Sequence, residues 1–186
     1  MNMKATRQLR DEHDGVTVML NIMEKACRHD QESGSLNMDH FESILEFLKV
    51  FVDKCHHAKE EELLFPALEA LGVPKEGGPI GEMLSEHAQG REFIKAMVAA
   101  SFEYKNGEKS ARGGMIRHAQ DYVSLLSGHI EKENNVLFVM AEKLLSEGQQ
   151  EELFQGFEKI EADRIGLGKH EAFHELIHTL KKIYLN

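Results

Sequence analysis

The sequence predicts an all-α protein: an antiparallel up-down four-helix bundle with one or two additional helices at its C-terminal end. Three observations support this fold class. Only 3 of the 186 residues are proline, and this scarcity of helix breakers favours long helices. No segment shows the sustained polar–apolar alternation of a strand. Four segments, separated by short glycine-containing stretches, instead repeat apolar residues every three or four positions.

The first two segments carry stripes with helical spacing. The stripe of the first segment, about residues 4–29, advances by alternating steps of four and three residues: Leu9, His13, Val16, Leu20, Met23 and Cys27. The second segment begins near Asn37, a residue type that caps helix N-termini. Its stripe consists of Phe41, Leu45, Leu48, Val52, His56, Glu60, Leu63 and Ala67. Both stripes thus place polar residues at positions that should face a core.

The third segment opens at GGPI, with Pro79 in the first helical turn, a favoured position for proline. Its stripe consists of Ile80, Leu84, His87, Arg91, Ile94 and Met97. The stripe of the fourth segment consists of Met115, Ala119, Tyr122, Leu126, His129, Glu133, Val136, Met140 and Leu144. Two further helices are expected at about 149–162 and 169–184. We therefore expect a four-helix bundle over residues 1–147 and a C-terminal helical extension over 148–186, packed on the bundle.

Composition and charge disfavour several classes of protein. The formal net charge is −10, which argues against nucleic acid and anionic membranes as partners. The N-terminus has no apolar signal-peptide region, and no apolar run reaches the roughly 20 residues of a membrane helix. The two cysteines, Cys27 and Cys55, make no disulfide framework. We therefore expect a soluble, cytoplasmic protein.

A motif is repeated in the second and fourth segments. Residues 56–65 read HHAKEEELLF, residues 129–138 read HIEKENNVLF, and both fit the pattern H-x-x-K-E-x-x-x-L-F. This alignment pairs the first His of each copy. An alignment that starts at His57 loses the Lys, Glu and Leu-Phe matches together. His57 is therefore interpreted as a residue around the ligands rather than one of them, and Glu61 and Glu62 are expected at the surface.

Each copy of the motif is preceded by a lone His that directly follows a Glu. His13 lies 43 residues before His56, and His87 lies 42 residues before His129. The chain is thus predicted to contain two helical hairpins, each offering one lone His and one His-x-x-x-Glu pair.

This spacing is typical of a metal site. Residues four apart on a helix point the same way, so each His-x-x-x-Glu pair directs an imidazole and a carboxylate at a common point. Packing the four stripes around one axis brings together six candidate ligands: His13, His56, Glu60, His87, His129 and Glu133. Unpaired, such groups cost roughly several kcal/mol each in a core. Two divalent ions, bridged by the carboxylates and each capped by two imidazoles, offset that cost, and mixed N/O ligation suits iron or manganese better than calcium.

The simpler interpretation of each residue is structural. A lone His on an apolar stripe is more often a hydrogen-bonded core residue than a ligand, and a run of Glu is usually a solvated helix face. Four segments, however, carry His or His-x-x-x-Glu on their inward faces, with the two halves in register. This coincidence favours the metal site.

Other residues are candidates for the surroundings of the ligands. Arg91 follows the third-segment His by one turn and is expected to steer anions or to pair with a ligand carboxylate. Tyr122 precedes the fourth-segment His by one heptad and is either a hydrogen-bond partner near the site or a core tyrosine. His170, His174 and His178 form a row that fits a metal site or a lid, but equally a partly exposed amphipathic helix with its apolar residues inward.

At these residues the chain resembles the hemerythrin-like, HHE cation-binding family. The resemblance covers about residues 5–145 and rests on the blocks CHHAKEEELLFP and HIEKENNVLF. It implies an antiparallel four-helix bundle that holds a non-haem di-iron centre, with ligand roles for the six candidates named above.

Two departures separate the chain from oxygen-carrying hemerythrins. Those proteins have a second His four residues after the third-helix ligand, where this chain has Arg91. They also end with His-x-x-x-x-Asp, where this chain has His129-x-x-x-Glu133. The pattern is nearer the four-His, two-Glu set of di-iron proteins associated with repair of iron centres under nitrosative stress. A symmetric site of that kind leaves both irons short of protein ligands, which favours reaction with small oxidants over reversible O₂ carriage.

The resemblance therefore implies a non-haem di-iron protein that binds or reacts with O₂, NO or peroxide, using an electron donor that the sequence does not identify. Two iron ions are the expected cofactor, with manganese or zinc as occupants in some preparations. The alternatives are a non-catalytic oxygen- or iron-binding or sensing protein, and a structural metal site. No Ser/His/Asp triad, phosphate loop or cysteine nucleophile supports other catalysis, and the sequence leaves open whether the protein is an enzyme.

Overall fold

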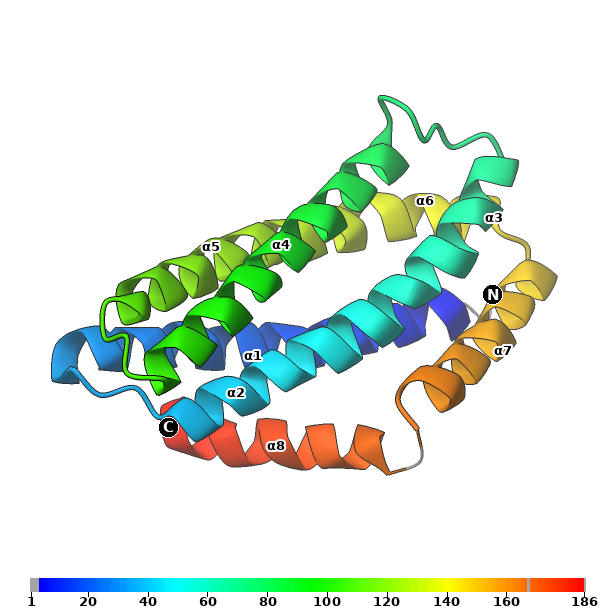
Figure 1. Ribbon diagram of the computed structural model, residues 1–186. Helices are drawn as coiled ribbons and strands as arrows, with labels where there is room; N and C mark the ends of the chain where they lie inside the picture. Colours follow the sequence, from blue (N-terminus) through cyan, green and yellow to red (C-terminus); the bar gives the residue numbers. More distant parts are fainter. Residues whose placement is uncertain (1–3, 167, 186) are drawn as a thin grey trace.

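The computed structural model describes residues 4–166 and 168–185, and every regular element within these ranges is helical (Figure 1). The first run is α1 (Lys4–Ser33), and the second comprises α2 (Met38–Phe47), η1 (Leu48–His57), η2 (Glu60–Leu64) and α3 (Phe65–Ala70). The third run is α4 (Pro79–Lys105), and the fourth comprises α5 (Ala111–Lys132), η3 (Glu133–Leu137) and α6 (Phe138–Leu144). Two helices follow, α7 (Glu147–Arg164) and α8 (Lys169–Tyr184). The all-α prediction is confirmed.

The helices begin where the sequence predicts. The side chain of Asn37 accepts a hydrogen bond from the backbone N–H of His40 at 3.1 Å, which caps α2. Pro79 occupies the first turn of α4. Ser146 and Gln149 form a reciprocal capping box at the start of α7. Local capping chemistry therefore accounts for the starts of three helices.

The elements η1, η2 and η3 are π-helical. A π-turn closes with an i→i+5 hydrogen bond and so contains one more residue than an α-turn, which changes the direction of the side chains that follow. These elements contain His56, His57, Glu60 and Glu133, and all four side chains are buried. The extra residue lets the adjacent His56 and His57 both reach the interior, which a regular 3.6-residue period does not predict.

The four helical runs lie side by side, and α8 runs along the outside of α1 and α2 (Figure 1). Two apolar clusters fill the interior. One contains residues such as Leu20, Phe47 and Met97, and the other contains residues such as Leu9, Leu68 and Phe138. Along each run, the candidate ligands fall at or next to the boundary between the positions of one cluster and those of the other. The interior is thus an apolar core interrupted by one buried polar layer.

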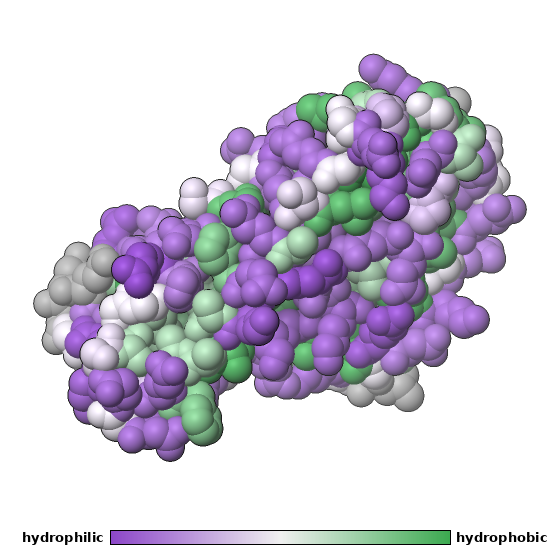
Figure 2. Space-filling view, turned by 45° about the horizontal axis from the view of Figure 1, so that its top comes forward, coloured by the Kyte–Doolittle hydropathy of each residue, from purple (hydrophilic) through white to green (hydrophobic). Residues whose placement is uncertain are grey.

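Both C-terminal helices pack against α1. Leu153 and Phe157 of α7 join one apolar cluster, and Phe173 and Leu180 of α8 join the other. Figure 2 shows a face on which hydrophilic side chains predominate and hydrophobic ones form smaller groups between them. Among the described helices, none is long and apolar enough to cross a membrane.

Candidate metal centre

The six candidate ligands meet in the buried polar layer. Two groups of potential ligand atoms each lie within 4.8 Å of one another, and they share Glu60. The members of the first group are His13, His56, Glu60 and Glu133; those of the second are His57, Glu60, His87 and His129. The structure thus brings together all six residues that the sequence singled out, and adds His57.

The imidazoles form two pairs whose Nε2 atoms converge. His13 Nε2 lies 2.9 Å from His56 Nε2, and His87 Nε2 lies 3.1 Å from His129 Nε2. Two nitrogens that each lie about 2.1 Å from one ion are about 3.0 Å apart at a right angle and about 3.4 Å apart at a tetrahedral angle. Each pair is therefore spaced to bind a single ion after little or no movement.

The two carboxylates connect these pairs. The two oxygens of Glu60 lie 3.6 Å from His56 Nε2 and 3.5 Å from His87 Nε2. Oε2 of Glu133 lies 3.2 Å from Nε2 of both His13 and His129. In the described part of the chain, none of the four carboxylate oxygens has a hydrogen-bond partner. Fully buried acceptors without donors are costly, and cations between the imidazole pairs would satisfy them.

Burial and proximity move the two carboxylates in opposite directions. Desolvation raises the pKa of Glu60 well above its ordinary value, and the neighbouring Glu133 carboxylate raises it further. Burial also acts to raise the pKa of Glu133, but His129 and His13 outweigh it and hold that pKa well below its ordinary value. Of the two carboxyl groups, Glu60 therefore holds its proton more readily than Glu133 does.

His57 belongs to this layer and is not peripheral to it. Its ring stacks on that of His87 with centroids 3.8 Å apart, and it is only 4% exposed. Neither ring nitrogen has a hydrogen-bond partner among the described residues. Burial, followed by the nearby His87, lowers the pKa of His57 well below its ordinary value, so the ring is neutral and able to donate a lone pair. The alignment of the repeat follows sequence spacing and takes no account of the π-turn, so it did not predict that His57 lies in this layer.

The ring nitrogens that face away from the centre are held by protein oxygens. Each Nδ1 lies 2.7–3.0 Å from its partner, and the pairs are His13–Asn134, His56–Glu12, His87–Glu61 and His129–Glu86. Such contacts fix the tautomer that leaves Nε2 available for a metal. Glu12 and Glu86 directly precede the lone His of each half, and this repeated Glu-His pair could have identified them from the sequence. Asn134 had no such signal.

Arg91 lies further from the ligand layer than expected, and Glu61 lies nearer to it. Arg91 donates to Asp53 and to Glu61, each at 2.6 Å, and Glu61 in turn contacts His87. Arg91 thus pairs with Glu61, which orients the imidazole of His87, and not with Glu60 or Glu133. Glu61, expected at the surface, is partly buried, and His87 and Arg91 together outweigh its desolvation and lower its pKa. Glu62 is exposed, as expected, and pairs with Arg164.

The lysines of the repeat differ in their surroundings. Nζ of Lys59 lies 2.5 Å from Oε1 of Glu12 and 2.8 Å from Oε2 of Glu161 on α7, and the side chain is fully buried. Lys132 contacts Glu86 and Glu82, and 38% of its side chain is exposed. Helix α7 therefore contributes to the burial of Glu12, whereas Glu86 lies nearer to solvent.

The remaining candidates lie outside the ligand layer. Tyr122 packs in an apolar cluster, and its buried hydroxyl has no hydrogen-bond partner in the described ranges, so of its two predicted roles it has that of a core tyrosine. Burial raises the pKa of its hydroxyl. His170 and His174 contact one another, and His170 reaches the site only through Glu161 and Lys59. Cys27 and Cys55 are buried and free, and desolvation raises their thiol pKa to about 12, which argues against a nucleophilic role.

An all-helical chain with converging imidazoles and buried carboxylates in its core is typical of helical cation-binding proteins. The chain belongs to the hemerythrin HHE cation-binding domain family, whose model matches residues 4–141. It is also similar to uncharacterized proteins of Mycobacterium bovis and of two strains of Mycobacterium tuberculosis. Each is 21% identical over 178 residues, which cover 96% of this chain and 69% of the relative. No solved structure matches the chain.

Proposed function

We propose that the protein is an antiparallel up-down four-helix bundle that holds a non-haem di-iron centre and binds or reacts with O₂, NO or peroxide. One observation carries the proposal most strongly. Glu60 and Glu133 are fully buried, have no hydrogen-bond donors among the described residues, and each approaches both imidazole pairs. This is the arrangement of two carboxylates that bridge two cations.

The donor set favours iron. Imidazole and carboxylate ligands together suit iron or manganese, whereas calcium prefers an all-oxygen shell and structural zinc sites are closed by four ligands. In our proposal His57 is a fifth imidazole, so that three imidazoles face one cation and two face the other. Oxidation or reduction of a small ligand is the chemistry that an iron pair supplies when bound.

The chain's own residues orient the ligands and exclude water. Glu12, Glu61 and Glu86 hold the outer ring nitrogens, which keeps the Nε2 lone pairs directed inward. Phe138 stacks on His13 at 5.3 Å and Phe65 on His87 at 5.8 Å, measured between ring centroids. The group that contains His13 has two imidazoles, and the group that contains His87 has three. A small ligand would therefore bind on the His13 side.

Metal analysis combined with optical spectroscopy tests the proposal. We expect about two irons per chain in aerobically purified protein, with near-ultraviolet absorption typical of an oxo-bridged pair that changes when peroxide or NO is added. A single zinc ion per chain, or an intact fold without metal, would contradict the redox function. A stable change that reverses when O₂ is removed would instead favour the alternative of non-catalytic oxygen binding.

Two neighbouring variants test the ligand assignment. We expect His56→Ala to lose metal from the side of the site that has only two imidazoles. His57→Ala should retain one ion and weaken the other, because His87 and His129 remain. Unchanged affinity and spectrum in His57→Ala would return His57 to a purely structural role.

A further inference from the structure

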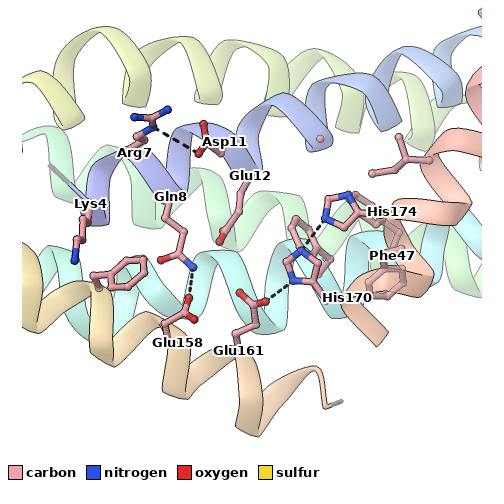
Figure 3. A pocket seen from close by; sticks show the side chains of 15 residues that line it. Lys4, Arg7, Gln8, Asp11, Glu12, Phe47, Glu158, Glu161, His170 and His174 are labelled. Carbon is pink, nitrogen blue, oxygen red and sulfur yellow. Dashed lines mark hydrogen bonds and ion pairs between the residues drawn. The ribbon is translucent and has the colours of Figure 1, made fainter. Parts of the chain in front are cut away.

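A pocket of about 510 Å³ is lined by residues of α1 and of the two C-terminal helices (Figure 3). It lies against residues of α1, α7, α8 and the second helical run, and its polar lining includes Glu12, Glu161, His170 and His174. The two His residues belong to α8, beyond the part of the chain that the family model matches. Neither residue belongs to the two groups of potential ligand atoms in the central layer.

The two histidines of α8 repeat the geometry of the buried imidazole pairs. Nε2 of His170 lies 2.8 Å from Nε2 of His174, compared with 2.9 Å and 3.1 Å for the pairs in the core. They are four residues apart on one helix, so both rings project from the same face. An approach of this length is close to the roughly 3.0 Å that separates two nitrogens at right angles on one ion.

The ring nitrogen of His170 that faces away from His174 has the kind of partner that metal-binding histidines have. Nδ1 of His170 contacts Oε1 of Glu161 (Figure 3). In the core, Nδ1 of His56 contacts Glu12 in the same way. Phe51 meets the His170 ring edge-on, with centroids 5.9 Å apart, which further restricts the ring. The carboxylate fixes the tautomer that leaves the Nε2 lone pair of His170 toward His174 and the cavity.

The charges around the pair permit a cation to bind. Of the cationic groups that line or border the cavity, Lys59 is held between Glu12 and Glu161, and Lys4 pairs with Glu151. Arg7 lies 4.0 Å from Asp11. Each of these positive charges is therefore compensated by a nearby carboxylate.

We propose that His170 and His174 form a third cation site, which binds one divalent transition-metal ion such as Zn²⁺, Ni²⁺ or Co²⁺ through their Nε2 atoms. Glu161 is a positioning residue for His170, and water completes the coordination shell. With two protein ligands and an exposed His174, the ion exchanges readily, unlike ions held in the buried centre. The site does not depend on which metal occupies the centre or on its reactivity.

Equilibrium dialysis against Ni²⁺ tests the proposal, using protein whose metal content is measured first. We expect the wild-type chain to bind one additional Ni²⁺ without releasing metal already present. His174→Ala should lose this equivalent, whereas His178→Ala, which removes the next residue of the same exposed row, should retain it. Glu161→Gln should weaken binding by about tenfold.

The outcomes separate this site from the central one. Failure of the wild-type chain to bind an additional Ni²⁺ would overturn the proposal, and so would an additional Ni²⁺ that persists in His174→Ala. The contact between Nε2 of His170 and Nε2 of His174 would then be only a hydrogen bond between the two rings. Failure of the di-iron proposal would instead change the metal content measured before dialysis and leave the additional Ni²⁺ in place.

Discussion

Lys59 and Lys132 occupy equivalent positions in the two copies of the motif, yet their removal should have very different effects. Lys59 is fully buried between Glu12 and Glu161, and Glu12 is itself only 7% exposed. Burial favours the neutral amine, but the two carboxylates outweigh it and raise the pKa of Lys59 above its ordinary value. Lys132 pairs with Glu82 and Glu86 near the solvent. The two lysines therefore form a matched pair for one experiment.

The expected magnitudes follow from burial. Replacement of Lys59 by Ala leaves the buried Glu12 carboxylate without its cation, a change that typically costs roughly 3–5 kcal/mol. Replacement of Lys132 by Ala removes a partly exposed pair, which contributes about 0–1 kcal/mol. Lys59→Met keeps most of the side-chain volume and should be nearly as destabilised as Lys59→Ala, because the unpaired charge and not the lost packing dominates. Combining Lys59→Met with Glu12→Gln should restore part of the loss.

Urea unfolding followed by circular dichroism measures these differences. The variants should be compared in chelator-treated form near pH 7, so that metal binding does not contribute to the free energy of unfolding. The reasoning predicts a gap of roughly 2 kcal/mol or more between Lys59→Ala and Lys132→Ala. Equal free energies of unfolding, or a larger loss in Lys132→Ala, would refute the claim that Lys59 forms a buried ion pair with Glu12 beneath α7.

Three further predictions concern protonation and backbone. The pKa of Glu60 is raised above 4.5 in the fold, so Glu60 makes the metal-free protein less stable as pH rises above that value. Metal loading at a pH at which Glu60 is still protonated should release that proton. Calorimetry of metal binding in two buffers with different ionisation enthalpies measures this release, and no buffer dependence would contradict it. Gly128 lies inside α5, and a Cβ added there meets no atom within 4 Å. Gly128→Ala should therefore raise the free energy of unfolding, measured in urea, by about 0.5–1 kcal/mol. Gly78→Ala would place its Cβ 2.2 Å from the carbonyl oxygen of Pro74, and should lower the melting temperature with a loss of about 1–3 kcal/mol; an unchanged melting temperature would show that this loop yields freely.

Much of the fold was predictable because its signals are local. The apolar stripes, the cap at Asn37 and the proline at the start of α4 depend only on nearby residues. The six candidate ligands could be singled out for the same reason, since a four-residue spacing on a helix fixes a common direction. The structure brings them into one layer, and their roles as ligands stay a prediction, as does the division into bundle and extension.

The features that escaped prediction depend on tertiary packing. The π-turns that bring His57 inward replace a regular period that the sequence pattern presupposes. Lys59 is paired with Glu161 of α7, a residue far from it in the sequence. Glu61 is partly buried because it contacts His87 and Arg91, which belong to another helix, α4. No spacing within one segment encodes such contacts.

Anomalous diffraction from crystals of the iron-loaded protein, recorded at the iron absorption edge, tests the central claim most directly. The account predicts two iron peaks in the buried layer, with the carboxylates of Glu60 and Glu133 between them. One peak should lie at the Nε2 atoms of His13 and His56, and the other at those of His87 and His129 with His57 alongside. A single peak in this layer, or none, would contradict a di-iron centre bridged by the two carboxylates.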